Sequence, residues 1–333
     1  MKRLLFPFLL FISIALFSQS SKEKGLKTIN KESAEAYVGF LASDALEGRE
    51  AGRHGGQVAG EYIKSLLQDL GIKLLNKDSY FQYFEAYSKE RQKRVRYSVH
   101  PDSISKYKEL AAHRKLKLRN VLGYIEGKNK YEFVVIGAHY DHLGMDEALS
   151  EDKIYNGADD NASGVSAVLQ IAKAFHASGE KPERSVIFAF WDGEELGLLG
   201  SEYFMLNCSF ASSIKGYLNF DMIGRNNNES NPKHVVYFYT ESHPAFGDWL
   251  KNDIKTYNLG LEPNYRPWDK PVGGSDNASF ATRDIPVIWY HTDGHPDYHQ
   301  PSDHADRINW DKLVEITKAA YLNLWNLANI KIY

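Results

Sequence analysis

The chain has 333 residues, of which 43% are hydrophobic and 25% are charged, so its composition is globular and excludes a disordered or fibrous protein. A formal net charge of -3 argues against a protein that binds nucleic acids through overall positive charge. Cys208 is the only cysteine, so an intrachain disulfide is excluded and stability has to come from the core.

The N-terminal segment has the pattern of a secretory signal peptide. Lys2 and Arg3 precede an apolar run from Leu4 to Phe17, and small and polar residues follow it. A membrane anchor is the alternative, but the run is short for a membrane span. We therefore predict a signal peptide at residues 1–19 and an exported protein, periplasmic or extracellular, without stable membrane insertion.

The region that follows combines helical and strand patterns. Residues 30–70 have helical spacing, interrupted by the Gly-rich stretch Leu46–Gly56, which predicts a loop. Residues 81–118 alternate weakly and carry many charges, which favours short strands and a connection. The basic run Lys89–Arg96 is typical of a solvated strand edge or loop.

From residue 133 onwards, compact apolar runs alternate with helical segments. Between the first two runs, residues 162–179 place Val165, Val168 and Leu169 on one helical stripe. Several runs lack polar alternation, as expected for strands that are buried on both faces. This rhythm predicts an α/β fold with a mixed, mostly parallel central sheet and helices on both faces. The predicted strands are Phe133–Ala138, Ser185–Trp191, Tyr217–Ile223, His234–Tyr239 and Ile285–Tyr290.

Histidines and carboxylates follow most of these strands. "HYDH" (residues 139–142) follows the first, "DGEELG" (192–197) the second, Asp221 ends the third, and "HTDGHPDYHQPSDH" (291–304) follows the last. The loop before the predicted helix reads "NGADDNASG" (156–164). Because open α/β sheets bind ligands at the carboxyl ends of their strands, we expect these side chains to meet at one edge.

The residue types indicate a metal site. Histidines and carboxylates without a usable thiol suit Zn²⁺, with Mn²⁺ or Co²⁺ as alternatives, and a bridging carboxylate would allow two ions. Of the adjacent Glu194 and Glu195, one can bind metal while the other acts as a general base. Taken alone, the same pair is also typical of a helix start, where acidic residues are favourable.

Six segments, in order along the chain, resemble those of the M28 family of zinc peptidases, in particular its leucyl aminopeptidase and aminopeptidase Y-like members. The match runs from about Asn30 to the C-terminus. The segments are "LASDALEGREAG" (41–52), "GAHYDH" (137–142), "NGADDNASG" (156–164), "WDGEELGLLGS" (191–201), "NFDMIG" (219–224) and "DYHQPSD" (297–303).

The resemblance implies a set of site residues. By position, His139, Asp160 and Asp221 correspond to the ligands of one zinc ion, and Asp160, Glu195 and His299 to those of the second. Asp160, and not Asp159, would bridge the two ions. Glu194 corresponds to the general base.

The resemblance also implies supporting residues. Asp141 corresponds to the carboxylate that holds the imidazole of His139. Tyr298 corresponds to a tyrosine that donates to the oxyanion in some members, with a packing tyrosine as the alternative. His142 is expected either to contact the metal ligands without binding metal itself or to lie at the surface. Asp303 is expected to orient His299 or its loop. The remaining histidines of the last motif, His291, His295 and His304, are expected to be loop or pocket residues.

The family fold implies one catalytic domain over residues 20–333, with helices and strands of residues 20–120 packed on it. The interval from Phe84 to Asn120 is too short for the protease-associated domain that many members carry.

The function implied is that of an exported dizinc aminopeptidase. It would hydrolyse N-terminal residues from peptides with a free N-terminus through a metal-bound hydroxide and a glutamate base. A glutaminyl cyclase-like aminoacyl transferase and a carboxypeptidase of the same family remain alternatives. A non-catalytic binding ectodomain is disfavoured because all five ligand positions and the base carry competent residues. The order of the motifs disfavours a two-metal phosphoesterase.

Overall fold

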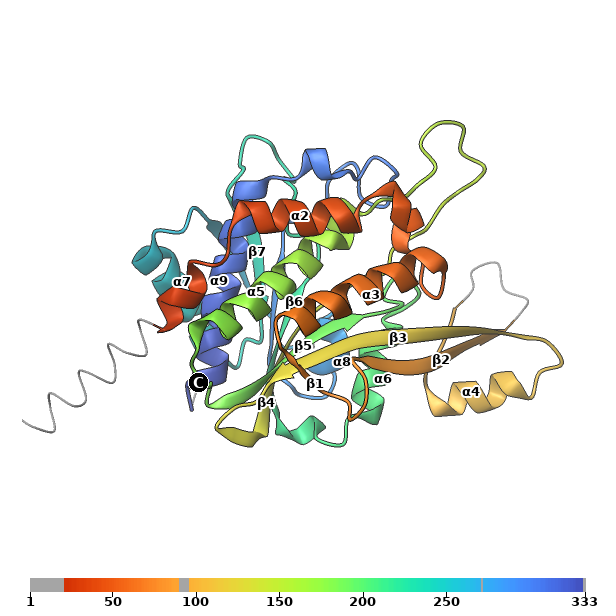
Figure 1. The fold of residues 1–333 in the computed structure, drawn as a ribbon, viewed down its shortest axis with the longest axis horizontal. Helices are drawn as coiled ribbons and strands as arrows, with labels where there is room; N and C mark the ends of the chain where they lie inside the picture. Colours follow the sequence, from red (N-terminus) through yellow and green to blue (C-terminus); the bar gives the residue numbers. More distant parts are fainter. Residues whose placement is uncertain (1–20, 90–95, 271, 332–333) are drawn as a thin grey trace, which may run out of the picture.

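A computed structural model of the chain describes residues 21–89, 96–270 and 272–331 (Figure 1). The predicted signal peptide and residues 90–95 of the basic run lie outside the described residues. Within the described part, no helix combines the length and apolar character needed to cross a membrane.

The centre of the fold is a mixed sheet whose middle strands are parallel. The strand order is β1-β3-β5-β4-β6-β9-β7-β8, and β2 also pairs with β3. Strands β5, β4, β6 and β9 run parallel, and antiparallel pairs with β3 and β7 flank them. The strands are β1 (Lys73–Leu74), β2 (Phe81–Lys89), β3 (His113–Ile125), β4 (Asn129–His139), β5 (Arg184–Trp191), β6 (Ile214–Phe220), β7 (His234–Tyr239), β8 (Glu262–Pro267) and β9 (Val287–His291).

Helices cover both faces of this sheet, which confirms the predicted fold class. Helices α2, α3, α5, α7 and α9 contribute to the core on one face, and α6 and α8 contribute to the core on the other. Figure 1 shows α2, α3 and α5 in front of the sheet. The helices are α2 (Lys31–Leu41), α3 (His54–Asp69), α4 (Pro101–Lys108), α5 (Gly164–Ser178), α6 (Leu199–Asn207), α7 (Ala245–Tyr257), α8 (Asn277–Ala281) and α9 (Trp310–Asn329).

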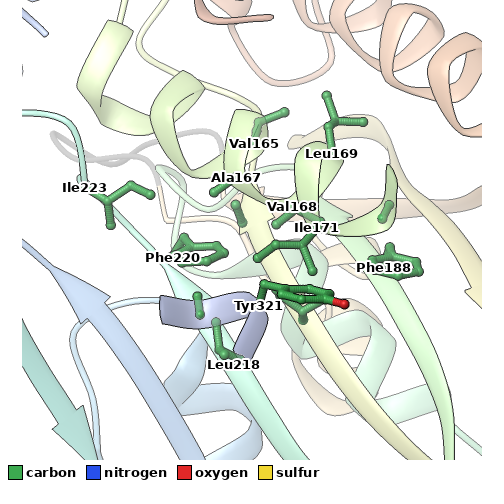
Figure 2. Close-up of a cluster of buried hydrophobic side chains, with 14 of the residues drawn as sticks. Val165, Ala167, Val168, Leu169, Ile171, Phe188, Leu218, Phe220, Ile223 and Tyr321 are labelled. Carbon is green, nitrogen blue, oxygen red and sulfur yellow. The ribbon is translucent and has the colours of Figure 1, made fainter. Parts of the chain in front are cut away.

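Strand β5 shows why the apolar runs lack polar alternation. Phe188 and Phe190 enter the core beneath α5, while Ile187 and Trp191 enter the opposite core. Successive side chains of a strand point to opposite faces, so a strand covered on both sides is apolar throughout. Figure 2 shows the first core, where Val168 and Ile171 lie close to Phe220 and Tyr321.

The structure corrects two expectations for the N-terminal third. Residues 30–70 form two helices, and the predicted loop between them contains a 3₁₀ turn at Asp44–Arg49 and the first residues of α3. In the described part of residues 81–118, the long strands β2 and β3 pair antiparallel and α4 lies between them in the sequence, instead of the short strands expected. The outer half of β3 is largely exposed, so burial imposes no apolar pattern on its sequence.

The predicted strands of the C-terminal two thirds are confirmed as β4, β5, β6, β7 and β9, and the predicted helix as α5. Strand β6 ends at Phe220, so Asp221 lies just beyond its carboxyl end. The carboxyl ends of the parallel strands β4, β5, β6 and β9 therefore meet at one edge of the sheet.

Candidate metal centre

The residues expected at the site surround one cavity of about 230 Å³ at this edge. His139 ends β4, Glu194 and Glu195 follow β5, and Asp221 follows β6. Asp160 lies in the turn at the start of α5. The lining comprises His139, Asp160, Glu194, Glu195, Asp221, Met222, Gly274, Trp289, His291, Gly294, Tyr298 and His299. A larger hollow of about 270 Å³, next to Thr240 and Trp268, is lined by none of these residues.

The first group of donor atoms is fully enclosed. The Nε2 atom of His139 lies 3.3 Å from Oδ1 of Asp160 and 3.6 Å from Oδ1 of Asp221. All three residues are buried, and together they present three donor atoms close enough to hold one metal ion. The structure thus brings together the three residues expected at the first zinc position.

The second group is built around Glu195 and shares Asp160 with the first. The Nε2 atom of His299 lies 3.2 Å from Oδ2 of Asp160 and 3.1 Å from Oε2 of Glu195. His142 joins this group, with Nδ1 2.7 Å from Oε1 of Glu195, and it is buried rather than at the surface. Asp160 directs one oxygen to each group, as a bridging carboxylate would.

Four contacts within these groups have the spacing that is expected between donors of a tetrahedral zinc ion. Donor atoms roughly 2.0–2.2 Å from such an ion stand about 3.3 Å apart. The contacts of His139 with Asp160 and Asp221, and those of His299 with Asp160 and Glu195, span 3.1 to 3.6 Å. The nitrogen and oxygen donors also suit zinc chemically. The residues therefore fit two zinc ions that share Asp160.

The electrostatics of the clusters also favour cations. Burial alone would raise the pKa of Asp160, but the imidazoles of His142, His139 and His299 lower it well below its ordinary value. Burial would lower the pKa of His299, but its contacts with Asp160 and Glu195 raise it to about 10. The carboxylates therefore hold positive charge at the imidazoles of His139 and His299, where a metal ion and a proton compete for the same nitrogen atoms.

This competition predicts proton release on zinc binding. With a pKa of about 10, His299 holds its proton at pH 8, and the pKa of His139 is also raised well above its ordinary value. Because zinc binds only the neutral imidazole, uptake at pH 8 should release about one proton per imidazole. Calorimetric titration in two buffers of different ionisation enthalpy measures this number. A His299→Asn variant should release about one proton fewer, and equal release would contradict the assignment.

The shared carboxylate gives a second prediction. Replacing Asp160 with alanine removes a donor oxygen from both groups. Mutating a residue that only hydrogen-bonds to a metal ligand already lowers metal affinity by about 10- to 100-fold. Loss of the shared ligand itself should therefore weaken the binding of both ions by at least about 100-fold. Replacing Asp221 with alanine should weaken only one ion. Zinc content after dialysis at fixed free zinc distinguishes these outcomes. Retention of one tightly bound ion by the Asp160 variant would argue against a bridge.

Asp141 supports both the first group and the glutamate pair. Its carboxylate accepts hydrogen bonds from the backbone N–H groups of Glu194, at 3.0 Å, and Glu195, at 3.3 Å. The same carboxylate lies 3.8 Å from Nδ1 of His139, whereas the backbone carbonyl oxygen of Asp141 lies nearer, at 3.2 Å. Asp141 is thus placed to fix the turn that carries Glu194 as well as the imidazole.

Glu194 projects into the cavity without joining either group of metal donors. Burial raises the pKa of Glu194 well above its ordinary value; His139 opposes the rise, and the negative charge of Asp221 adds to it. A carboxyl group whose pKa is raised is better suited to accept and return a proton near neutral pH than an ordinary surface glutamate.

Tyr298 lies at the mouth of the cavity. Its ring stacks on that of His299 at a centroid distance of 3.9 Å, and 45% of the residue is exposed. Burial and the negative charges of Asp160 and Glu195 raise the pKa of its hydroxyl, so the proton is retained. Tyr298 therefore keeps its hydroxyl proton while its ring packs on His299 at the edge of the cavity.

A buried polar network anchors the loop that carries Tyr298 and His299. The carboxylate of Asp303 accepts hydrogen bonds from the backbone N–H groups of Asp159 and Asp160. Arg225 donates to Asp297 at 2.7 Å. The φ angle of His299 is 56°, in the left-handed region that is costly for residues other than glycine, so this anchoring is what holds its imidazole at the clusters.

The other histidines of this loop lie away from the donor groups. His291 lines the cavity, and its Nδ1–H donates to the backbone oxygen of Asp221 at 2.6 Å rather than facing a donor atom. His295 is buried, with Nε2 3.2 Å from Oδ2 of Asp159, and His304 pairs with Asp152 near the surface. Asp159 accepts from the backbone N–H of Gly224 and so faces away from both clusters.

Arg49 is a residue that the sequence analysis did not single out. Its side chain is buried and donates to the backbone oxygens of Tyr140, next to His139, and of Gly157 and Asp160. It also donates to the backbone oxygens of Leu41 and Asn156. Burial lowers the pKa of its guanidinium to about 10, and the nearby carboxylates oppose that shift. The sequence signal that could have indicated a buried role for Arg49 is the position of an arginine among the small residues of "LEGREAG".

Comparison with known proteins agrees with this geometry. The profile of the family described as Peptidase family M28 matches residues 120–323. Leupeptin-inactivating enzyme 1 of Streptomyces exfoliatus is 38% identical over 140 residues, which cover 41% of this chain and 30% of that protein. Aminopeptidase Y of Saccharomyces cerevisiae is 27% identical over 219 residues, which cover 61% of this chain and 37% of that protein. The chain therefore spans about a third of the length of these curated relatives.

Solved structures share the fold across nearly the whole chain. The LapA aminopeptidase of Legionella pneumophila superposes with a TM-score of 0.68 at 22% identity, covering 93% of this chain and 74% of that one. The zinc aminopeptidase BSAP of Bacillus subtilis does so with a TM-score of 0.68 at 15% identity, covering 91% of this chain and 96% of that one. Because the M28 profile matches more than half of its residues and includes every donor of both clusters, the chain belongs to peptidase family M28.

Proposed function

We propose that the protein is a dizinc aminopeptidase that removes N-terminal residues from peptides. The observation that carries the proposal is that two groups of metal donors share Asp160 at the floor of a cavity into which Glu194 projects. His139, Asp160 and Asp221 would hold one ion, and Asp160, Glu195 and His299 the other. The similarity to aminopeptidase Y and the fold shared with a solved zinc aminopeptidase support the proposal.

The chain's own residues would divide the reaction between them. When bound, zinc ions supply a nucleophile from water and polarise the scissile carbonyl. Glu194 would take a proton from the attacking water and deliver it to the leaving amine. Tyr298 would donate its hydroxyl proton in a hydrogen bond to the developing oxyanion. Asp141 would keep the imidazole of His139 and the backbone of Glu194 in place.

The cavity favours a free amine over a carboxylate at the substrate end. Carboxylates line its floor, and none of the described residues that line it is a lysine or an arginine. A carboxypeptidase would need a cation there to bind the substrate's terminal carboxylate. A free N-terminal amine has no such requirement for a lysine or an arginine in the cavity. This distribution of charge supports aminopeptidase activity over carboxypeptidase activity.

The test uses the full-length mature protein and a library of peptides in three matched forms: free at both ends, N-acetylated, and C-amidated. Mass spectrometry should show loss of the N-terminal residue from the free and amidated forms only, and no loss after treatment with a zinc chelator. Cleavage of acetylated peptides from the C-terminus would identify a carboxypeptidase. Loss of ammonia from glutamine-initiated peptides, without release of an amino acid, would identify a glutaminyl cyclase.

We also propose that residues 1–19 direct export and that residues 20–333 form one catalytic unit. The charged start, the apolar run and the small residues after it support export. The mass of the protein recovered from the periplasm or the medium should correspond to removal of that segment. Recovery of the full-length chain with the membrane fraction would instead support an anchor.

A further inference from the structure

His142 lies beside the second metal position, but the proposed function gives it no role. Its side chain is fully buried, and its Nδ1 atom lies 2.7 Å from Oε1 of Glu195. The ring meets that of His299 edge-on at a centroid distance of 5.8 Å. The Nε2 atom is buried without a hydrogen-bond partner, so Nδ1 makes the hydrogen bond of this ring to the site.

The backbone around His142 fixes the direction of the ring. Its N–H donates to the carbonyl oxygen of Arg49 at 3.1 Å, and it forms a bridge with Glu50. Behind the ring, Gly157 approaches so closely that a Cβ atom there would lie 2.5 Å from Cδ2 of His142. The close approach of Gly157 and the hydrogen bond to Arg49 hold His142 with its Nδ1 atom at Glu195.

The distances distinguish a ligand from a residue that positions a ligand. Two donors of one tetrahedral zinc ion stand about 3.3 Å apart. Oε2 of Glu195 is 3.1 Å from Nε2 of His299 and fits that spacing. Nδ1 of His142 is 2.7 Å from Oε1 of Glu195, which is a hydrogen-bond length, and 3.9 Å from Oδ2 of Asp160. His142 thus contacts the glutamate oxygen that faces away from His299.

We propose that His142 is a positioning residue for the second metal ion. Because a carboxylate only accepts hydrogen bonds, Nδ1–H of His142 donates to Oε1 of Glu195 and leaves Oε2 as the oxygen presented to the ion. Without this bond, Glu195 would be free to rotate, and the ion would meet a less ordered ligand. The inference rests on the proposed dizinc site and adds to it the residue that orients one of its ligands.

The test compares two variants of similar size in the full-length protein. His142→Leu removes the donor, and His142→Asn retains an N–H close to the position of Nδ1. Zinc affinity is measured by competition with a chelator, in the wild-type background and in the Asp221→Ala background, which reports on the second ion. His142→Leu should lower the affinity for the second ion by about 10- to 100-fold and leave the affinity for the first unchanged. His142→Asn should recover most of that loss.

A Glu195→Ala background separates positioning from direct ligation. If His142 acts through Glu195, His142→Leu has no further effect on zinc binding once Glu195 is gone. A further loss there would overturn the proposal in favour of direct ligation. Equal weakening of both ions by His142→Leu would also overturn it, because that result indicates general disorder of the site.

A measurement on the zinc-loaded wild type does not depend on whether the variants fold. Nitrogen-15 labelling of the histidines should show Nδ1 of His142 protonated and protected from exchange, with the signal assigned through its covalent connection to the backbone of His142. An unprotonated Nδ1 would overturn the inference. Binding of fewer than two zinc ions by the wild type would defeat the proposed function itself, whereas two tightly bound ions in His142→Leu would defeat only the role of His142.

Discussion

Replacing Glu194 with glutamine is expected to lower the turnover of a free-amine peptide by about 100- to 10,000-fold, the usual contribution of a general base. The amide cannot accept the proton of the attacking water, but it has nearly the same shape as the carboxylate. Glu194 belongs to neither group of metal donors, so zinc content should stay at the wild-type level. Initial rates at saturating peptide, together with metal analysis of the same samples, give both quantities.

Glu195 provides the matched control for this substitution. It is adjacent in sequence and has the same chemistry, but its Oε2 atom lies 3.1 Å from Nε2 of His299 in the second cluster. Glu195→Gln should therefore lower zinc content, and its activity should recover in part when zinc is added in excess. If Glu194→Gln lost zinc while Glu195→Gln retained it, the two roles would have to be exchanged.

Replacing Arg49 with methionine is expected to lower the free energy of unfolding of the metal-free protein by at least about 5 kcal/mol. The guanidinium donates to five buried backbone oxygens, those of Leu41, Tyr140, Asn156, Gly157 and Asp160. Methionine fills a similar volume but leaves these acceptors without that donor, and each buried polar group that loses its partner costs about 1–3 kcal/mol. Urea unfolding followed by circular dichroism measures the change.

Arg53 is the control for charge and sequence position. It lies in the same segment, but its side chain is 68% exposed and pairs with Glu50 at 3.5 Å. Arg53→Met should change the free energy of unfolding by less than about 0.5 kcal/mol, as is usual for exposed residues. Equal effects of the two substitutions would show that the buried hydrogen bonds of Arg49 contribute nothing specific.

Much of the fold and the site follows from the sequence because burial leaves a strong pattern. Strands such as β4 and β5 are covered on both faces, so their apolar runs were recognisable. The candidate metal ligands and the candidate base lie just after those runs in the sequence: His139 follows Ala138, and Glu194 comes three positions after Trp191. The location of the site at the carboxyl ends of the parallel strands was therefore predictable from the order of strands and polar residues.

Some features could not be predicted from the sequence, because the role of a residue there depends on its neighbours in the folded structure. Arg49 resembles a solvated charge in a Gly-rich stretch, and only the folded chain brings the carbonyl oxygens of Tyr140 and Gly157 around it. His142 was expected near the site, but its contact with Glu195 depends on the packing of β4 beside β5. The length of the β2–β3 hairpin was not predicted, because the outer half of β3 is exposed to solvent and carries no apolar pattern.

The placement of the proposed ligands also has a consequence for how the protein acquires its metal. His139, Asp160, Glu195, Asp221 and His299 are each at least 21 positions apart in the sequence, so only folding brings these five residues together. Non-local contacts of this kind form late in folding, after the loops between them have closed. Zinc should therefore bind only after the sheet is assembled. Its binding energy at these two positions then adds to the stability of the folded state.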